Sequence, residues 1–378
     1  MTSMVGLIVN PIAGMGGSVG LKGTDGDEVV RRARELGAIP RAGARAAAAL
    51  EELAGAGLDV RLVTCAGDMG ENAALTAHMV PEIVFRPATP GDTSSDDTRQ
   101  AARAMLDAGV DLLVFAGGDG TARDIVEAVG EAVPVVAVPA GVKIHSAVYA
   151  VNPRAAGDLL VAVLRSGSAR TREAEVMDVD EDAVRDGRLA TRLYGYLRVP
   201  DDARLVQAGK VRSRSEDATA DLLAAAVADS MEPGTTYILG PGTTIRRIAR
   251  RLGFEGTLLG VDVVRDGALV AADVGERQLL EHVGQARSAR IVVTPIGGQG
   301  YLFGRGNQQI SARVIRATGF DGVIVVATAD KLAALAGRPL LVDTDDEDLN
   351  RMLSGYIPVV TGRGRRAMYP VAYPRDER

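Results

Sequence analysis

One carboxylate among glycines, Asp119 in the stretch Gly117-Gly118-Asp119-Gly120-Thr121, is the group in this sequence best suited to chemistry. Residues 111–115, apolar after Asp111, predict a buried strand before it, and the apolar spacing of residues 122–130 predicts a helix after it. Glycines let a ligand approach the backbone, and the first N–H groups of a helix attract anions. A carboxylate beside phosphate is unfavourable unless it accepts a proton or holds a metal ion. The stretch therefore predicts a phosphate site with Asp119 as a base or metal-linked carboxylate; a plain tight turn is the alternative.

A second glycine-rich loop follows the first predicted strand, residues 5–9. The residues in it that could bind phosphate are Asn10, Pro11, Gly14, Gly16 and Gly17. Ligands of open parallel α/β sheets bind outside the carboxyl ends of the strands. We therefore expect this loop and the loop at Asp119 to face one cleft. The alternative is that Asn10-Pro11 only ends a strand.

Further glycine-rich stretches are candidates for completing such a site. In one of them, glycines and threonines lie between a predicted strand and a predicted helix. The phosphate-binding candidates there are Gly240, Gly242, Thr243 and Thr244. The candidate lid or substrate residues are Lys22, Thr24, Asp25, Lys143, His145, Gly298 and Gln299. Solvated loops, tight turns and a structural histidine are the alternatives for these positions.

The elements that must position these residues fall into three parts. Predicted strands and helices alternate from residue 1 to about 150, which indicates βαβ units on a parallel sheet. At 378 residues, the chain exceeds the size at which single cores stop growing. We predict an α/β nucleotide-binding domain over residues 1–152 and a β-rich substrate domain over residues 153–322. Residues 323–378 are predicted to pack back on the first domain.

The composition is that of a globular protein, with 47% hydrophobic residues, 24% charged residues and a net charge of −6. The negative charge argues against nucleic acid or an anionic membrane as a partner, and no apolar run approaches the ~20 residues of a membrane span. The single cysteine, Cys65, fits a reduced, cytoplasmic setting. With it, the three histidines His78, His145 and His282 show no zinc-ligand spacing, so we predict no metal held by the protein itself.

These features favour phosphoryl transfer. Several loops suit phosphate, whereas no nucleophilic cysteine and no Ser-His-Asp set for an acyl enzyme is recognisable. The Walker pattern and the protein-kinase signatures are absent from the sequence.

Two motifs in the expected order, Asn10-Pro11-x-Ala13-Gly14 and Gly117-Gly118-Asp119-Gly120-Thr121, resemble those of the NAD kinase and diacylglycerol/sphingosine kinase group. Strings at residues 20–26, 139–145, 240–244 and 294–300 resemble the ATP-NAD kinase-like branch that includes acetoin catabolism protein X. The resemblance covers nearly the whole chain. It implies a Rossmann-like parallel α/β domain, a β-rich, β-sandwich-like second domain with a carboxyl-terminal return, and usually a homo-oligomer. It also implies that Asp119 assists transfer to the adenosine-ribose 2′-hydroxyl of NAD, giving NADP. The cofactors that the resemblance implies are ATP and Mg²⁺, with the metal ion carried by the nucleotide, and the partners that it implies are small-molecule nucleotides.

The sequence also departs from that group. Where NAD kinases hold adenine with an Asn-Glu pair, the comparable stretch here is Leu193-Tyr194-Gly195-Tyr196-Leu197. Residues 240–244 match the Thr-Pro-Thr-Gly-Ser-Thr loop of those enzymes only loosely. NAD is the leading acceptor, and another soluble acceptor, a polyol or a related nucleotide, is the alternative. A lipid kinase and a non-catalytic nucleotide sensor are further hypotheses, and the donor is open between ATP and polyphosphate.

Overall fold

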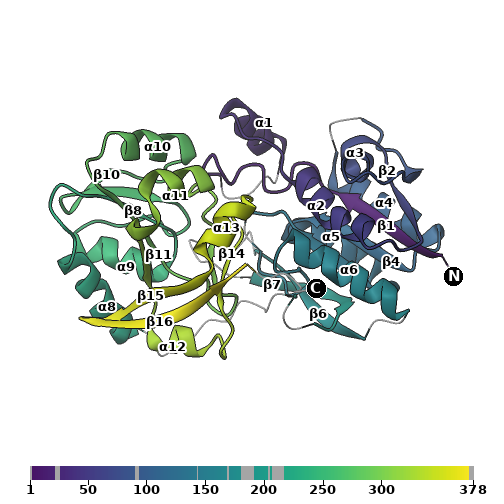
Figure 1. Cartoon of the computed structure of the whole chain (residues 1–378). Helices are drawn as coiled ribbons and strands as arrows, with labels where there is room; N and C mark the ends of the chain where they lie inside the picture. Colours follow the sequence, from purple (N-terminus) through teal and green to yellow (C-terminus); the bar gives the residue numbers. More distant parts are fainter. Residues whose placement is uncertain are drawn as a thin grey trace. The chain divides into compact units, whose positions relative to one another are not determined.

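The computed structural model describes residues 2–21, 26–89, 93–142, 144–167, 170–179, 191–202, 205–206 and 217–373 (Figure 1). These residues form two compact units. Unit 1 lies within Met1–Met15 and Ile39–Gly209, and unit 2 lies within Gly16–Ala38 and Lys210–Tyr373. Unit 2 thus takes one of its segments from near the amino terminus. The division at residues 152 and 322 stays a prediction.

The main sheet of unit 1 is parallel, with the strand order β3-β2-β1-β4-β5. The strands are β1 (Ser3–Val9), β2 (Val60–Cys65), β3 (Glu82–Phe85), β4 (Leu112–Gly117) and β5 (Val135–Pro139). Continuous apolar runs form such strands when both faces of a sheet are covered, and all residues of β4 and β5 are buried.

The strand order reverses between β1 and β4. From β1 the chain continues to β2 and β3 on one side of it, and β4 and β5 lie on the other side. The loops after β1 and β4 therefore flank the point at which the strand order reverses. Open α/β sheets bind their ligands at this point.

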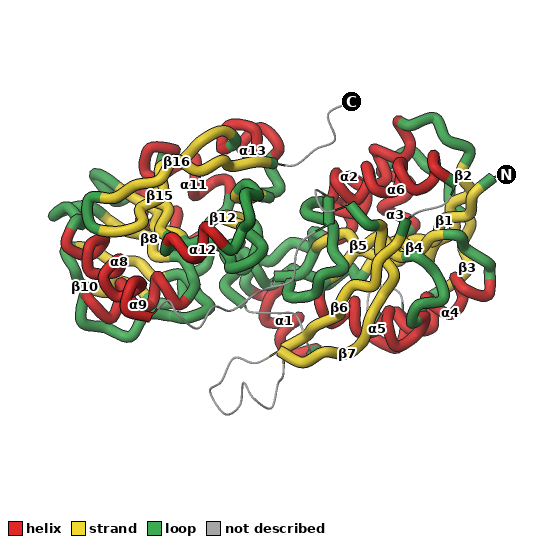
Figure 2. Tube along the Cα trace, turned by 90° about the horizontal axis from the view of Figure 1, so that it is seen from below, coloured by secondary structure: helices red, strands yellow, loops and turns green. Residues whose placement is uncertain are grey.

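Helices pack on this sheet, and α2 and α6 lie side by side (Figure 1). The helices of unit 1 are α2 (Ala42–Gly55), η1 (Gly67–Met69), α3 (Glu71–Thr76), α4 (Ser95–Asp107), α5 (Asp119–Val129) and α6 (Pro153–Ser166). Gly157 permits the contact of α6 with α2, because a Cβ there would lie 2.5 Å from the carbonyl oxygen of Ala49. The antiparallel strands β6 (Thr171–Val179) and β7 (Thr191–Pro200) run side by side in Figure 2.

The sheet of unit 2 has the strand order β10-β9-β8-β11-β13-β15-β16-β14-β12 among the described residues. Its strands are β8 (Thr236–Leu239), β9 (Asp262–Arg265), β10 (Ala268–Ala271), β11 (Ala289–Val293), β12 (Tyr301–Phe303), β13 (Val323–Val326), β14 (Leu340–Val342), β15 (Gly355–Gly362) and β16 (Arg365–Ala372). The neighbours β8, β11, β13 and β15 are parallel to one another.

Alternate residues of the central strands of unit 2 face opposite sides of the sheet. Tyr237 and Leu239 pack with residues of α8 and α9, whereas Ile238 packs in a cluster with residues of α10, α11 and α13. Helices, rather than a second sheet, therefore cover both faces. The helices of unit 2 are α1 (Asp27–Glu35), α8 (Asp217–Asp229), α9 (Thr243–Arg251), α10 (Glu276–Gly284), α11 (Ala312–Thr318), η2 (Phe320–Gly322), α12 (Ala329–Ala333) and α13 (Glu347–Leu353).

The predicted fold class is confirmed: a parallel α/β unit is joined to a β-rich second unit. Strands β13 to β16 pair within the sheet of unit 2. The predicted return of residues 323–378 to the first domain stays a prediction. Among the helices that the structure describes, none combines the length and the apolar character needed to cross a membrane.

Candidate functional site

Three loops meet at the carboxyl edge of the main sheet of unit 1, after β1, β4 and β5. Asn10 of the first loop donates from Nδ2 to Thr121 Oγ1, in the first turn of α5, at 2.9 Å. The backbone N–H groups of Ala140 and Gly141, in the third loop, donate to Gly117 O at 2.8 and 3.0 Å. Hydrogen bonds therefore join the Asn10 loop to the Asp119 loop and the Asp119 loop to the loop after β5.

Two glycines permit the close approach of these loops. Gly14 has a φ of +73°, and a Cβ there would lie 1.8 Å from Ala140 O. A Cβ on Gly118 would lie 3.0 Å from Cα of Gly141. Because every other residue type carries a Cβ, a substitution of Gly14 must displace the loop after β5.

Asp119 is the first residue of α5 and is only 5% exposed. Its Oδ2 accepts a hydrogen bond from His145 N at 2.6 Å, and its Oδ1 accepts from Ser146 N at 3.1 Å and from Ser146 Oγ at 2.6 Å. Nδ1 of His145 lies 3.1 Å from Oδ2. A carboxylate offers about four lone-pair sites, so these four contacts take up its accepting capacity.

The structure adds two residues that the sequence did not single out. Ser146 Oγ accepts a hydrogen bond from Met177 N at 2.9 Å, which ties the loop after β5 to β6. Tyr149 donates from its hydroxyl group to Gly118 O at 2.5 Å and packs edge-on against Phe115, with ring centroids 5.6 Å apart. The signal for both residues in the sequence is only their position soon after a predicted strand.

Asp119 does not fit as a direct ligand of Mg²⁺ in this arrangement. Its lone pairs are taken by N–H and O–H donors, whereas Mg²⁺ requires them for coordination. The described part of the chain also contains no group of three or more His, Cys, Asp or Glu side chains suited to a metal ion.

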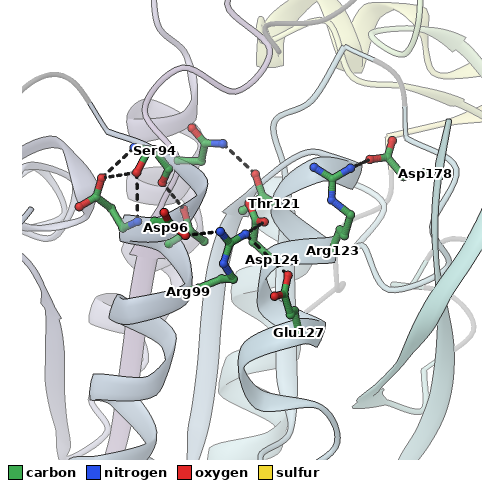
Figure 3. A network of polar contacts seen from close by, with 11 residues as sticks. Ser94, Asp96, Arg99, Thr121, Arg123, Asp124, Glu127 and Asp178 are labelled. Atoms are coloured by element: carbon green, nitrogen blue, oxygen red, sulfur yellow. Dashed lines mark hydrogen bonds and ion pairs between the residues drawn. The ribbon is translucent and has the colours of Figure 1, made fainter. Parts of the chain in front are cut away.

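A network of polar contacts continues along α5 (Figure 3). Asp124, 5% exposed, accepts a hydrogen bond from Arg99 Nη1 of α4 at 2.8 Å. Arg99 also pairs with Asp96 and lies 3.6 Å from Glu127. Burial raises the pKa of the Asp124 carboxyl to about 6, although the positive charges of Arg123 and Arg99 oppose the change. Asp124 therefore exchanges a proton in mildly acidic solution.

The predicted phosphate junction at Gly242 belongs to unit 2. A cavity of about 140 Å³ beside the first turn of α9 is lined by Thr243, Arg246, Arg247, Arg250 and Leu258. Glu255 pairs with Arg246 and Arg250 at 2.6 and 2.8 Å, so part of the positive charge of this cavity is already compensated. Thr244, the second residue of α9, is buried.

The loop after β11 lies next to this junction. A Cβ on Gly242 would lie 3.1 Å from Cγ2 of Thr294, and Lys331 donates from Nζ to Thr294 Oγ1 at 2.9 Å. Lys331 lies in the short helix α12, far along the chain from Thr294, and no pattern in the sequence indicates this contact. The carbonyl of Gly298 accepts a hydrogen bond from Arg338 Nη2 at 2.8 Å, and Gln299 is buried.

The predicted site residues are thus divided between the units. Unit 1 holds Asn10, Pro11, Gly14, Gly117, Gly118, Asp119, Gly120, Thr121 and His145. Unit 2 holds Gly16, Gly17, Gly240, Gly242, Thr243, Thr244, Gly298 and Gln299. The predicted residues Lys22, Thr24, Asp25 and Lys143 lie outside the described residues.

Two protein-family models match the chain. The model of the ATP-NAD kinase N-terminal domain matches residues 5–168, and the model of the ATP-NAD kinase C-terminal domain matches residues 233–371. The first match contains the three loops around Asp119, and the second contains the junction at Gly242. No curated protein matches the chain.

Proposed function

The chain belongs to the ATP-NAD kinase family and is therefore a phosphotransferase, and on that premise we propose that it transfers a phosphoryl group from ATP to a hydroxyl group of a small soluble molecule. The acceptor that we propose first is the adenosine-ribose 2′-hydroxyl of NAD, with NADP as the product. Mg²⁺ enters with the phosphates of ATP. Polyphosphate is the alternative donor.

One observation carries this proposal: the carboxylate of Asp119 is held where three glycine-containing loops meet, at the edge where the strand order reverses. The N-cap of α5 is Gly118, whose lack of a side chain leaves the first N–H groups of the helix uncapped by a neighbouring side chain. Gly117, Gly120 and Thr121 complete the proposed phosphate-binding turn. This combination suits phosphoryl transfer, in which positioning and electrostatics supply most of the catalysis.

A different soluble acceptor, a polyol or a related nucleotide, is the second candidate. The observation in its favour is the stretch Leu193–Leu197, which lies in β7 and contains no amide or carboxylate side chain that could hold adenine. Within this stretch, Leu193, Tyr194 and Tyr196 are 43%, 37% and 39% exposed. We propose that specificity, rather than the reaction type, differs if NAD is not the acceptor.

The test is detection of phosphorylated product by mass spectrometry after incubation with ATP, Mg²⁺ and a panel of acceptors: NAD, NADH, small polyols and lipid vesicles. Asp119→Asn should lower turnover by at least ~10²-fold and leave nucleotide affinity largely unchanged. Asp107→Asn, at an exposed position in α4, is the matched control and should behave as the wild type.

Each result has a distinct meaning. NADP formed by the wild type and lost in Asp119→Asn supports the first candidate, and product from a polyol supports the second. Phosphorylation of lipid in vesicles alone would indicate a lipid kinase. Nucleotide binding without any product would point to a sensor and would refute the proposal, and an Asp119→Asn variant with normal turnover would remove Asp119 from the reaction.

A further inference from the structure

We propose that His145 is the general base of this site and that Asp119 is the carboxylate that orients it. This inference deepens the proposed function and rests on it. It assigns the acceptor's proton to an imidazole nitrogen, whereas the sequence motif points to the carboxylate of Asp119 itself.

The first argument is the accepting capacity of Asp119. Two backbone N–H groups already donate to it, at 2.6 and 3.1 Å, and Nδ1 of His145 is a further contact. The hydroxyl group of Ser146 donates to it at 2.6 Å and has Met177 O as a longer alternative acceptor at 2.9 Å, so the two N–H groups are the donors that Asp119 alone satisfies. An acceptor hydroxyl would have to break one of these bonds before it could give its proton to Asp119. A buried donor left without its acceptor costs about 1–3 kcal/mol, so direct proton transfer to Asp119 carries an added penalty.

The second argument is the tautomer that this geometry imposes on His145. Nδ1 lies 3.1 Å from Oδ2 of Asp119, and the two side chains are 6% and 4% exposed. An ionised carboxylate only accepts hydrogen bonds, so Nδ1 must carry the proton. In the neutral imidazole Nε2 then carries the lone pair, and no hydrogen bond of Nε2 exists within the described part of the chain. The nitrogen that can act as a base is therefore the one left without a partner.

The third argument is the rigidity of the pair. His145 N donates to the same Oδ2 that faces its ring, and the neighbouring Ser146 is bonded both to Asp119 and to Met177 of β6. Tyr149 holds the carbonyl of Gly118, directly before Asp119. A base keeps its geometry during the reaction when packing and the hydrogen bonds of its neighbours hold it in place.

The proposed step balances as follows. The hydroxyl oxygen of the acceptor forms a bond with the γ-phosphorus of ATP while the bond from that phosphorus to the β,γ-bridging oxygen breaks, and ADP leaves with the bond's electron pair. The hydroxyl proton passes to Nε2 of His145, and the resulting imidazolium is stabilised by the ionised Asp119. The proton then passes to solvent when products leave. Such a carboxylate-oriented histidine serves as the base in unrelated hydrolases.

The tautomer can be measured without any enzymatic turnover. The chain has three histidines, so ¹⁵N NMR of histidine-labelled protein yields few signals, and His78→Gln and His282→Gln variants assign them. We expect Nδ1 of His145 to be protonated and Nε2 to be unprotonated in the neutral ring, and we expect Asp119→Asn to abolish that preference. A ring with its proton on Nε2 would overturn the proposal.

Turnover of His145 variants is the second test. His145→Asn keeps an N–H donor near the position of Nδ1 but has no basic nitrogen. It should lower turnover by at least ~10²-fold with unchanged nucleotide affinity and an unchanged circular dichroism spectrum. His145→Gln, which removes the imidazole but keeps a longer amide, should lose turnover as well, and His282→Gln, in α10, should retain it.

The outcomes separate the two proposals. Normal turnover of His145→Asn beside an inactive Asp119→Asn would overturn the role of His145 and leave Asp119 as the base. Product from none of the acceptors with wild-type protein would refute the proposed function. In that case the tautomer measurement alone decides whether the Asp119–His145 pair exists as described.

Discussion

Asp124 makes the stability of unit 1 depend on pH in a direction opposite to that of most carboxylates. Burial raises the pKa of its carboxyl from an ordinary 3.8 to about 6 in the folded chain. Between these two values the folded state holds a proton that the unfolded state has lost. The free energy of unfolding must therefore fall as the pH rises through this window.

The size of the effect follows from the same values. A shift of about two pKa units corresponds to about 3 kcal/mol, present below pH 4 and lost above pH 6. Asp124→Asn removes this titration and keeps a side chain of similar shape beside Arg99. We expect the stability of the variant relative to wild type to rise by about 3 kcal/mol between pH 4 and pH 7.

Amide hydrogen exchange of α4 and α5, followed by mass spectrometry and corrected for the intrinsic pH dependence of exchange, measures this difference locally. Glu127→Gln is the control, because Glu127 faces the same arginine but its side chain is 60% exposed. A stability difference between Asp124→Asn and wild type that stays constant from pH 4 to pH 7 would refute the reasoning. If the difference between Glu127→Gln and wild type changed with pH by a similar amount, the effect would come from the charges around Arg99 and not from the burial of Asp124.

Three further variants or measurements test other parts of the structure. Gly14→Ala should destabilise unit 1 by more than the ~1–2 kcal/mol that a left-handed backbone costs a non-glycine residue, because the new Cβ would lie 1.8 Å from Ala140 O. Thermal unfolding measures this loss of stability. Arg305→Met should destabilise unit 2 by about 3–5 kcal/mol in urea unfolding, because it removes the 2.8 Å ion pair between two buried side chains, Arg305 and Asp343. Cys65 is fully buried, and burial raises its pKa to about 12, so a thiol reagent at pH 8 should label it only after unfolding.

The two substitutions each have a control in the same chain, and the labelling of Cys65 has a refuting outcome. Gly57→Ala also places a side chain at positive φ, +66°, but its Cβ would have no atom within 4 Å, so a loss as large as that of Gly14→Ala would rule out the clash. Arg316→Met breaks a pair with Asp346 whose side chains are 41% and 33% exposed, and it should cost only about 0–1 kcal/mol. Rapid labelling of Cys65 in the native protein would show that β2 opens readily.

The junction at Asp119 is predictable from the sequence because its determinants are local. An apolar run followed by glycines predicts a strand, a turn and a helix, and the structure places β4 at Leu112–Gly117 and α5 at Asp119–Val129. The helix begins three residues before the apolar spacing indicates. A carboxylate in the first turn suits the positive end of a helix, which accounts for the earlier start.

The partners of Asp119 are not predictable in the same way. His145 and Ser146 lie 26 and 27 residues farther along the chain, and they reach Asp119 because β5 pairs with β4 in parallel. No periodicity in a single sequence specifies which strands become neighbours. For the same reason, the sequence indicated a histidine near the site but not that its Nδ1 faces Asp119.

The segment Gly16–Ala38 is synthesised long before the rest of the unit in which it packs. Within unit 2, Ser18 O accepts a hydrogen bond from Glu276 N, and Gly17 packs against the side chain of Gln308. This segment leaves the ribosome long before those partners. The strands of the main sheet of unit 1 can pair while the segment is still an unpacked loop, because closing a loop of this size costs little free energy. A gene fragment that encodes only Lys210–Tyr373 would therefore lack part of its own fold, although the missing part is encoded near the opposite end.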